Sequence, residues 1–164
     1  MLELESQVTV DGLTGAEVTD FLLDCEDARY QTWWPATHLQ LHPVAHGPGD
    51  EHVGDVVLMD ELIGSRRVRM AAEVAEVEPG EKLVWRMRWR RVRLPVRLTL
   101  TLQPLAHGVR IRHVITAGWS GPGRILDPLW RLYFSPSFEA AMDRHAHTEF
   151  PLLRDLLRAE RERS

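Results

Sequence analysis

The clearest pattern in the chain is a strict alternation of apolar and polar residues between Lys82 and Ile115. It divides into three runs, separated by breaks near Arg91 and at Ala106-His107-Gly108. Alternation with a period of two is typical of strands with one buried and one solvated face. Three such runs in succession predict an antiparallel meander, and its buried face is rich in Trp and Leu.

Four further strands and two short helices are predicted before this meander. Residues 2–10 alternate in the same way, and strands are also expected over 38–46, 52–63 and 66–77, each ended by a turn. Thr14-Gly15-Ala16-Glu17 is a capping-box pattern that predicts the start of a helix. A second helix over 26–34 is expected to stop before Pro35.

The chain changes character after Trp119. Apolar residues recur at helical spacing over 125–133 and again beyond Ser135-Pro136, which fits an N-cap followed by proline at the first helical position. A long terminal helix is therefore predicted, interrupted at Pro136 and kinked at Pro151. Residues 158–164 are charged and are expected to fray. The predicted order is β-αα-ββββββ-α, an α+β fold.

Composition limits the protein class. A chain of 164 residues with 44% hydrophobic and 27% charged residues is expected to form one soluble domain over 1–164. The net charge of −4 gives no reason to expect a nucleic-acid partner. No apolar run approaches the roughly 20 residues of a membrane span, and no signal peptide is recognised. Cys25, the only cysteine, is expected to be a buried, inert thiol, and a cytoplasmic location is expected.

The element order and three local details resemble the START-like, or SRPBCC, superfamily, also called the helix-grip fold. The details are the Trp33-Trp34-Pro35 corner after the two short helices, the hairpin stretch from Val74 to Arg86, and the Gly/Pro loop before the final helix. The resemblance covers about residues 2–158. It implies a seven-stranded curved antiparallel sheet wrapped around a long C-terminal helix, with a deep cavity between them. Such proteins include bacterial polyketide cyclases, coenzyme-Q-binding proteins and lipid-transfer domains, whose catalytic residues differ, so none is carried over.

Two histidines are candidates for acid/base chemistry at such a cavity. His113 alternates with the apolar residues of its strand, which places it on the concave face, and His145 shares a helical stripe with Met142. Imidazole titrates near neutral pH, so a His113–His145 pair is the best acid/base candidate in the chain. The same patterns also fit a core histidine and a half-exposed histidine at the rim of the helix.

Asp60 is a third candidate, and its position depends on the register of its strand. One face of the strand holds Asp60 and the other holds Glu61, and the two faces are equally apolar. If Asp60 faces inward, burial should raise its pKa and it could act as a base. If it lies solvated at the strand end, it has no such role.

The eight histidines also raise the question of a metal site. His38 and His42 are expected on the outer face of a strand, roughly 13 Å apart, too far to share an ion with each other or with His46. The set His145, His147 and Glu149 has the spacing of a strand but falls on a helix. No metal and no cofactor are therefore expected.

Arginines gather on the predicted outer face of the sheet, at positions 86, 88, 90, 91, 93 and 97. Glu3 and Glu5 are expected to face Arg110 and Arg112 if the first and last strands pair. Cross-strand ion pairs of this kind are worth only a few tenths of a kcal/mol each. A solvated, partly paired face is expected, with contact to an anionic ligand as the alternative.

Aromatic and large apolar side chains are the candidates for ligand binding. Trp33 and Trp34 are placed at the entrance, and Tyr133 offers a phenol that could hold a carbonyl or hydroxyl group. The full set is Trp33, Trp34, Trp85, Met87, Trp89, Leu100, Ile111, Trp119, Trp130, Tyr133, Phe134, Phe138 and Met142. The same side chains could instead fill the interior as a packed core.

Two functions follow from this arrangement. The first is binding of a hydrophobic small molecule of polyketide, isoprenoid or lipid type between the sheet and the terminal helix. The second is a cofactor-free cyclase or dehydratase that uses His113, with His145 or Asp60, to move protons. A partner-binding module that uses the sheet edge or the basic face is a third possibility. The sequence indicates no oligomeric state.

Overall fold

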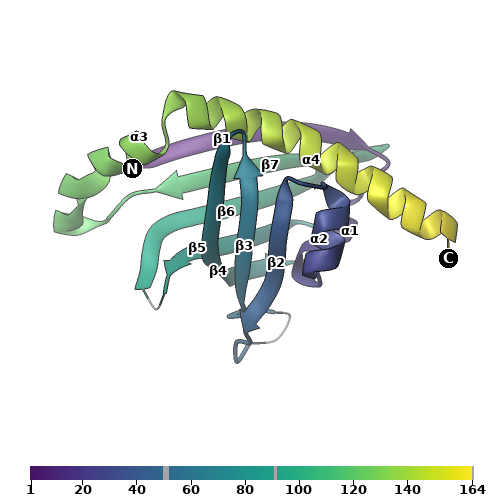
Figure 1. Ribbon diagram of the computed structural model, residues 1–164, viewed down its shortest axis with the longest axis horizontal. Coiled ribbons are helices and arrows are strands. Elements are labelled where there is room, and N and C mark those ends of the chain that lie inside the picture. Colours follow the sequence, from purple (N-terminus) through teal and green to yellow (C-terminus); the bar gives the residue numbers. More distant parts are fainter. Residues whose placement is uncertain (50–51, 91, 164) are drawn as a thin grey trace.

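The computed structural model describes residues 1–49, 52–90 and 92–163 and has the predicted helix-grip architecture (Figure 1). Seven strands form one curved antiparallel sheet in the order β1-β7-β6-β5-β4-β3-β2. Their bounds are β1 Leu2–Asp11, β2 His38–Ala45, β3 Val56–Ile63, β4 Arg66–Glu78, β5 Lys82–Trp89, β6 Val92–Pro104 and β7 Gly108–Ala117. The chain returns to pair its first strand with its last, as the resemblance implied.

The helices lie close to where the patterns placed them, except that η1 begins within the Gly/Pro loop predicted over residues 120–123. α1 (Gly15–Leu23) and α2 (Asp27–Trp33) connect β1 to β2, and the short η1 (Gly121–Leu126) and α3 (Asp127–Tyr133) follow β7. α4 (Pro136–Arg163) is the long terminal helix that lies along the sheet (Figure 1). The capping box is confirmed, because the Thr14 hydroxyl accepts from the Glu17 N–H and the Glu17 carboxylate accepts from the Thr14 N–H at 2.8 Å.

One expectation for the terminal helix needs adjustment. α4 begins at Pro136, separate from α3, as predicted, and it includes Pro151 within one helix of 28 residues. Residues 158–163 are helical and not frayed. Ion pairs explain this order, since Arg158 contacts Glu162 and Arg161 contacts Glu17 of α1.

The core lies between α4 and the concave face of the sheet. Alternate residues of β1 are buried, and α4 contributes Phe150, Leu153 and Leu157 to the same cluster. On the outside, the Arg112 guanidinium donates to both oxygens of Glu5 at 2.8 and 2.7 Å, as the pairing of β1 with β7 predicted. Arg110 bonds the side chain of Gln103 instead.

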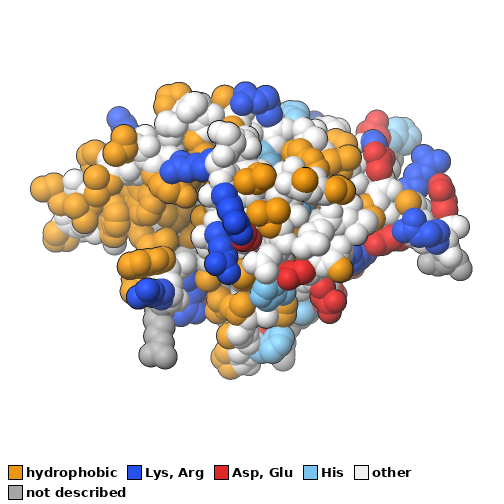
Figure 2. Space-filling view, in the orientation of Figure 1, with side chains coloured by type: hydrophobic (Ala, Val, Ile, Leu, Met, Phe, Trp, Pro, Cys, Tyr) orange, Lys and Arg blue, Asp and Glu red, His pale blue; other side chains and the backbone are white. Residues whose placement is uncertain are grey.

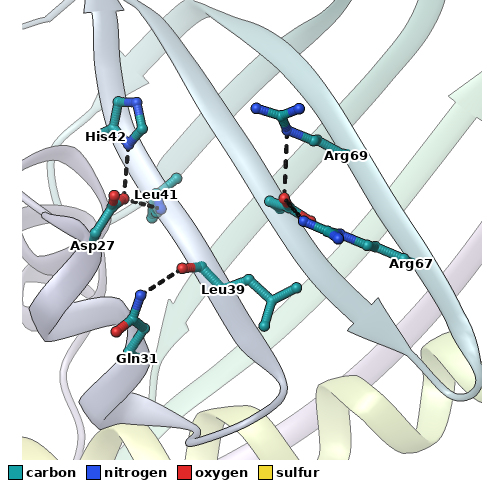
Figure 3. A network of polar contacts seen from close by, with 8 residues as sticks. Asp27, Gln31, Leu39, Leu41, His42, Arg67 and Arg69 are labelled. Atoms are coloured by element: carbon teal, nitrogen blue, oxygen red, sulfur yellow. Dashed lines mark hydrogen bonds and ion pairs between the residues drawn. The ribbon is translucent and has the colours of Figure 1, made fainter.

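A bulge at the start of β2 turns His38 inward. His38 pairs with Glu61 and Gln40 pairs with Asp60, so the register shifts between them, and the His38 side chain is completely buried. The prediction that His38 lies on the outer face is therefore wrong, because a bulge breaks simple alternation. Asp27 and Gln31 of α2 hold this strand by bonding the backbone of Leu41 and Leu39 (Figure 3).

The register of β3 settles the position of Asp60. The inner face carries Val57, Met59, Glu61 and Ile63, and Asp60 lies on the outer face, where Arg67 donates to both its oxygens at 2.8 and 2.7 Å. Arg69 approaches the same carboxylate at 3.4 Å (Figure 3).

The Asp60 pKa follows from these partners. The hydrogen bonds from Arg67 hold it below its usual range. The expectation of an inward carboxyl with a raised pKa is thus corrected, since the guanidinium groups that cover Asp60 stabilise its charged form.

The segment of η1 and α3 carries an exposed apolar surface. Ile125, Leu126, Leu129 and Leu132 are all exposed, and Figure 2 shows hydrophobic side chains gathered at this end of the molecule. The helical stripe predicted here is therefore only partly packed against the body. Among the described residues, no helix combines the length and apolar character that crossing a bilayer requires.

Candidate functional site

An apolar cavity lies between the N-terminal half of α4 and the sheet. Its volume is about 50 Å³, room for one or two water molecules, so the interior is nearly filled. Among the described residues on its wall, Glu61 is the only acidic or basic side chain. The rest of the lining is Met59, Ile63, Val68, Met70, Met87, Val96, Leu98, Ile115, Tyr133, Phe134, Phe138 and Met142.

A larger groove of about 520 Å³ adjoins this cavity on the side of α3. The two spaces share Met70, Met87, Val96, Tyr133 and Phe134. Methionine side chains are flexible and adapt to irregular shapes. The boundary between the groove and the cavity is therefore formed by apolar side chains, two of them flexible methionines.

The rim of the groove is basic, with Arg69, Arg88 and Arg90 among its residues. Arg69 and Arg88 are paired with Asp60 and Glu73, whereas Arg90 has no ion pair with any residue in the described ranges and lies over the ring of Trp89. The arginine face is thus partly paired, as expected. Arg90 is the cation at this rim that is best placed to meet an anionic group.

Most of the predicted ligand-binding residues line these two spaces. Met87, Tyr133 and Phe134 border both, Phe138 and Met142 border the cavity, and Trp89 and Trp130 border the groove. Trp89 is not buried, however: it is 65% exposed at the end of β5.

The remaining predicted residues lie elsewhere. Trp33 is buried and not at an entrance, and its indole N–H donates to the Glu149 carbonyl at 2.6 Å. Trp34 packs on the ring of His145, with 4.7 Å between centroids, and Trp119 packs on Trp130. Three others lie in the interior: Trp85, Leu100 and Ile111.

A second small hollow of about 40 Å³ lies beside His113. His113 is buried on the concave side, as predicted, and burial lowers its pKa even though Glu149 and Glu61 act in the opposite direction. Its surroundings therefore favour the neutral imidazole. Trp85 and Leu100 line this hollow together with His113, Glu61 and Glu149.

Four titratable side chains converge next to both hollows: His38, Glu61, His145 and Glu149, here called the His/Glu cluster. The His145 Nε2 atom lies 3.4 Å from an oxygen of Glu61 and 3.4 Å from an oxygen of Glu149. The His38 Nε2 atom lies 3.8 and 3.6 Å from the same two carboxylates. All four side chains are largely or wholly enclosed.

The charges in the His/Glu cluster shift one another strongly. Burial alone would lower the pKa of His145, but the carboxylates of Glu149 and Glu61 outweigh it and raise this pKa to about 10. Burial alone would raise the pKa of Glu149, but His145 and His38 bring it well below its usual range. The Tyr30 hydroxyl also donates to Glu61, at 2.9 Å.

Sequence reasoning found His145 but missed its partners. Within the described residues, no hydrogen bond or ring contact joins His145 to His113, although the charge of His145 acts on the His113 pKa. The spacing of His145 and Glu149, four residues apart on a helix, was a usable signal. His38 and Glu61 were not predictable, because one depends on a bulge and the other on the register of β3.

Two further predictions can be compared with the structure. Cys25 is buried, and burial raises the pKa of its thiol to about 12, which agrees with an inert thiol. His38, His42 and His46 contact different partners: the His/Glu cluster, Asp27 and Asp55.

Comparison with models of known protein families assigns the chain to one family. A family model described as "Polyketide cyclase / dehydrase and lipid transport" matches residues 1–148. The chain belongs to this family. Membership supports a ligand-binding or cyclase-type role and fits a cavity between sheet and terminal helix. No curated protein matches the chain.

Solved structures confirm the fold at low sequence identity. TTHA0849 from Thermus thermophilus is 14% identical with a TM-score of 0.63, over 97% of this chain and 99% of that one. NE0264 from Nitrosomonas europaea is 16% identical with a TM-score of 0.55, over 97% of each chain. The di-domain ARO/CYC BexL is 16% identical with a TM-score of 0.54, over 88% of this chain and 46% of that one. At these identities the likeness shows the fold alone.

Proposed function

We propose that this protein binds a hydrophobic small molecule of polyketide, isoprenoid or fatty-acyl type in the groove beside α3. The observation that carries the proposal is the continuous apolar lining that the groove shares with the cavity under α4. The family description, which includes lipid transport, supports the same role. Burial of apolar surface, at about 25 cal/mol per Å², supplies the driving force.

The sizes of the two spaces decide where the guest lies. A cavity of about 50 Å³ cannot hold a drug-sized molecule, whereas a groove of about 520 Å³ falls within the usual range for ligand sites. The body of the guest therefore occupies the groove, and its tip enters the cavity when the methionines at the boundary change rotamer. An acidic or carbonyl end meets Arg90 at the rim.

The test is a binding assay with the anionic apolar dye 1-anilinonaphthalene-8-sulfonate. Met70 borders both spaces, so Met70→Trp should fill the passage and weaken dye binding at least tenfold. Leu132→Trp adds the same side chain at an exposed position outside both linings and should leave affinity unchanged. Oleate should displace the dye more effectively than oleyl alcohol, because only oleate carries an anion for Arg90.

Two results would contradict this proposal. One is equal dye affinity in the wild type and in Met70→Trp, with both variants folded by circular dichroism. The other is the absence of any co-purified apolar compound and of any oleate binding when the intact protein is analysed by native mass spectrometry.

A catalytic form of this proposal adds proton transfer within the bound guest. The specific observation in its favour is that His113, whose pKa burial lowers, borders the same hollow as Glu61, which also borders the cavity. His113→Ala should then keep oleate affinity within about twofold but abolish cyclisation or dehydration of a polyketone substrate. Turnover that survives this substitution contradicts a catalytic role for His113.

A further inference from the structure

We propose that His38, Glu61, His145 and Glu149 bind one divalent transition-metal ion, best matched by zinc, in a closed four-coordinate site. The ligands come from three elements, His38 from β2, Glu61 from β3, and His145 with Glu149 from α4. The ion would tie the terminal helix to the far strands of the sheet. The site shares Glu61 with the wall of the apolar cavity but none of its four ligands with the groove, and metal binding does not depend on the proposed function.

The spacing of the donor atoms fits a tetrahedron. Zinc bonds of about 2.0–2.1 Å to nitrogen and oxygen give donor–donor edges of about 3.3–3.4 Å in tetrahedral geometry. Four nitrogen–oxygen distances in the His/Glu cluster are 3.4, 3.4, 3.6 and 3.8 Å. All four ligand atoms lie within 4.8 Å of one another, so small side-chain movements complete the shell.

The Nε2 atoms of His38 and His145 face the carboxylates of Glu61 and Glu149 at 3.4–3.8 Å as ion pairs, without a hydrogen bond of good geometry. Both ring nitrogens of His38 and the Nε2 atom of His145 are buried and lack a hydrogen-bond partner within the described part of the chain. His38 is 0% exposed and His145 is 5% exposed. Buried polar atoms without partners are costly and rare, and a bound cation would satisfy an imidazole nitrogen from each ring.

The charge of the cluster also matches a divalent ion. Two carboxylates and two neutral imidazoles carry a formal charge of −2 in a largely enclosed place, which one divalent cation neutralises. Protonation of His145 alone leaves one negative charge uncompensated. Imidazole with carboxylate favours zinc and its transition-metal neighbours, whereas calcium and magnesium prefer oxygen ligands throughout.

Neighbouring aromatic residues fix the orientation of the ligands. The Tyr30 ring stacks on His38 with 4.0 Å between centroids, and its hydroxyl donates to Glu61. Trp34 packs on His145, and the Trp33 indole bonds the backbone of Glu149. Such outer contacts hold ligands in place at metal sites. The alternative is a metal-free buried ion-pair network made of the same four groups.

Cobalt and zinc distinguish these alternatives. Purified full-length protein is stripped with a chelator, desalted, and titrated with Co²⁺, whose intense visible bands report tetrahedral coordination, and then with Zn²⁺. Native mass spectrometry counts the ions, and thermal melts follow stability. The variants are His145→Gln and Glu61→Gln. The matched control is His147→Gln, an exposed histidine on the same helix whose ring contacts only Asp143 among the described residues.

The expected result is one ion per chain, cobalt bands that zinc abolishes, and an unfolding equilibrium constant about 100-fold smaller when zinc is 100-fold above its Kd. Both cluster variants should lose the bands, and His147→Gln should keep them. Wild-type protein without cobalt bands and without a zinc-dependent melt overturns the proposal, as do bands that persist in folded cluster variants. Should the variants not fold, zinc-induced shifts of the His38 and His145 imidazole NMR signals in the wild type decide the question.

Discussion

At the scale of single residues, two adjacent carboxylates have opposite surroundings. Asp60 lies under the guanidinium groups of Arg67 and Arg69 on the outer face, and Glu61 faces the interior beside His145. The sequence could not assign these faces, because both faces of the strand are apolar and a shift of one residue exchanges them. The assignment comes from the pairing of β3 with its two neighbours in the sheet.

Removing the Asp60 charge should destabilise the fold. Asp60→Asn takes away one acceptor of the two hydrogen bonds from Arg67, so the free energy of unfolding should fall by about 1–3 kcal/mol in urea denaturation at pH 7. Asp20→Asn, an exposed acid, serves as the control and should cost less than about 0.5 kcal/mol. Equal unfolding midpoints for Asp60→Asn and the wild type would contradict the expected role of the pair.

The pH dependence of this difference follows from the pKa of Asp60. Because the pKa is lowered in the folded state, the stabilisation is complete above the pKa of the unfolded chain, about 3.9. It is lost as the pH falls through that value and then through the lower folded value. The stability of wild type and Asp60→Asn should therefore converge only in this acidic range.

At the scale of secondary-structure elements, regular patterns were predictable and local irregularities were not. The capping box at Thr14 and the separate start of α4 at Pro136 follow from local chemistry. The bulge after His38 depends on the register that β3 and α2 impose, so alternation within β2 alone pointed the side chain the wrong way. This irregularity accounts for the failure to place His38 in the His/Glu cluster.

Pro151 gives a prediction for α4. A proline inside a helix has no N–H to donate to the carbonyl four residues earlier, which lowers the free energy of unfolding by about 3 kcal/mol relative to alanine. Proline also stiffens the unfolded chain, which offsets about 0.4–1 kcal/mol of this loss. Pro151→Ala should therefore raise the free energy of unfolding by about 2–2.6 kcal/mol, measured by urea denaturation. Pro136→Ala is the control, because the first helical turn has no N–H bond to lose, and it should change little. A loss of stability in Pro151→Ala would show that its ring packing matters more than the missing bond.

At the scale of the whole molecule, the topology was predictable but the interior was not. Period-two runs, helix starts and the aromatic corner at Trp33 were enough to give seven strands around a terminal helix. The free volume depends on how side chains from distant segments interlock, and a cavity of only about 50 Å³ could not be deduced from the aromatic residues that border it. Exposure of Trp89 and burial of Trp33 are further outcomes of packing between distant elements.

Glu61 belongs at once to the wall of the apolar cavity and to the His/Glu cluster. Anything that touches this carboxylate from one side changes what it offers to the other side. If a hydrophobic guest and a cation both bind as proposed, thermodynamic reciprocity requires that any change one makes in the other's affinity is returned by the same factor. The loading of one site during purification would thus set the apparent Kd recorded at the other.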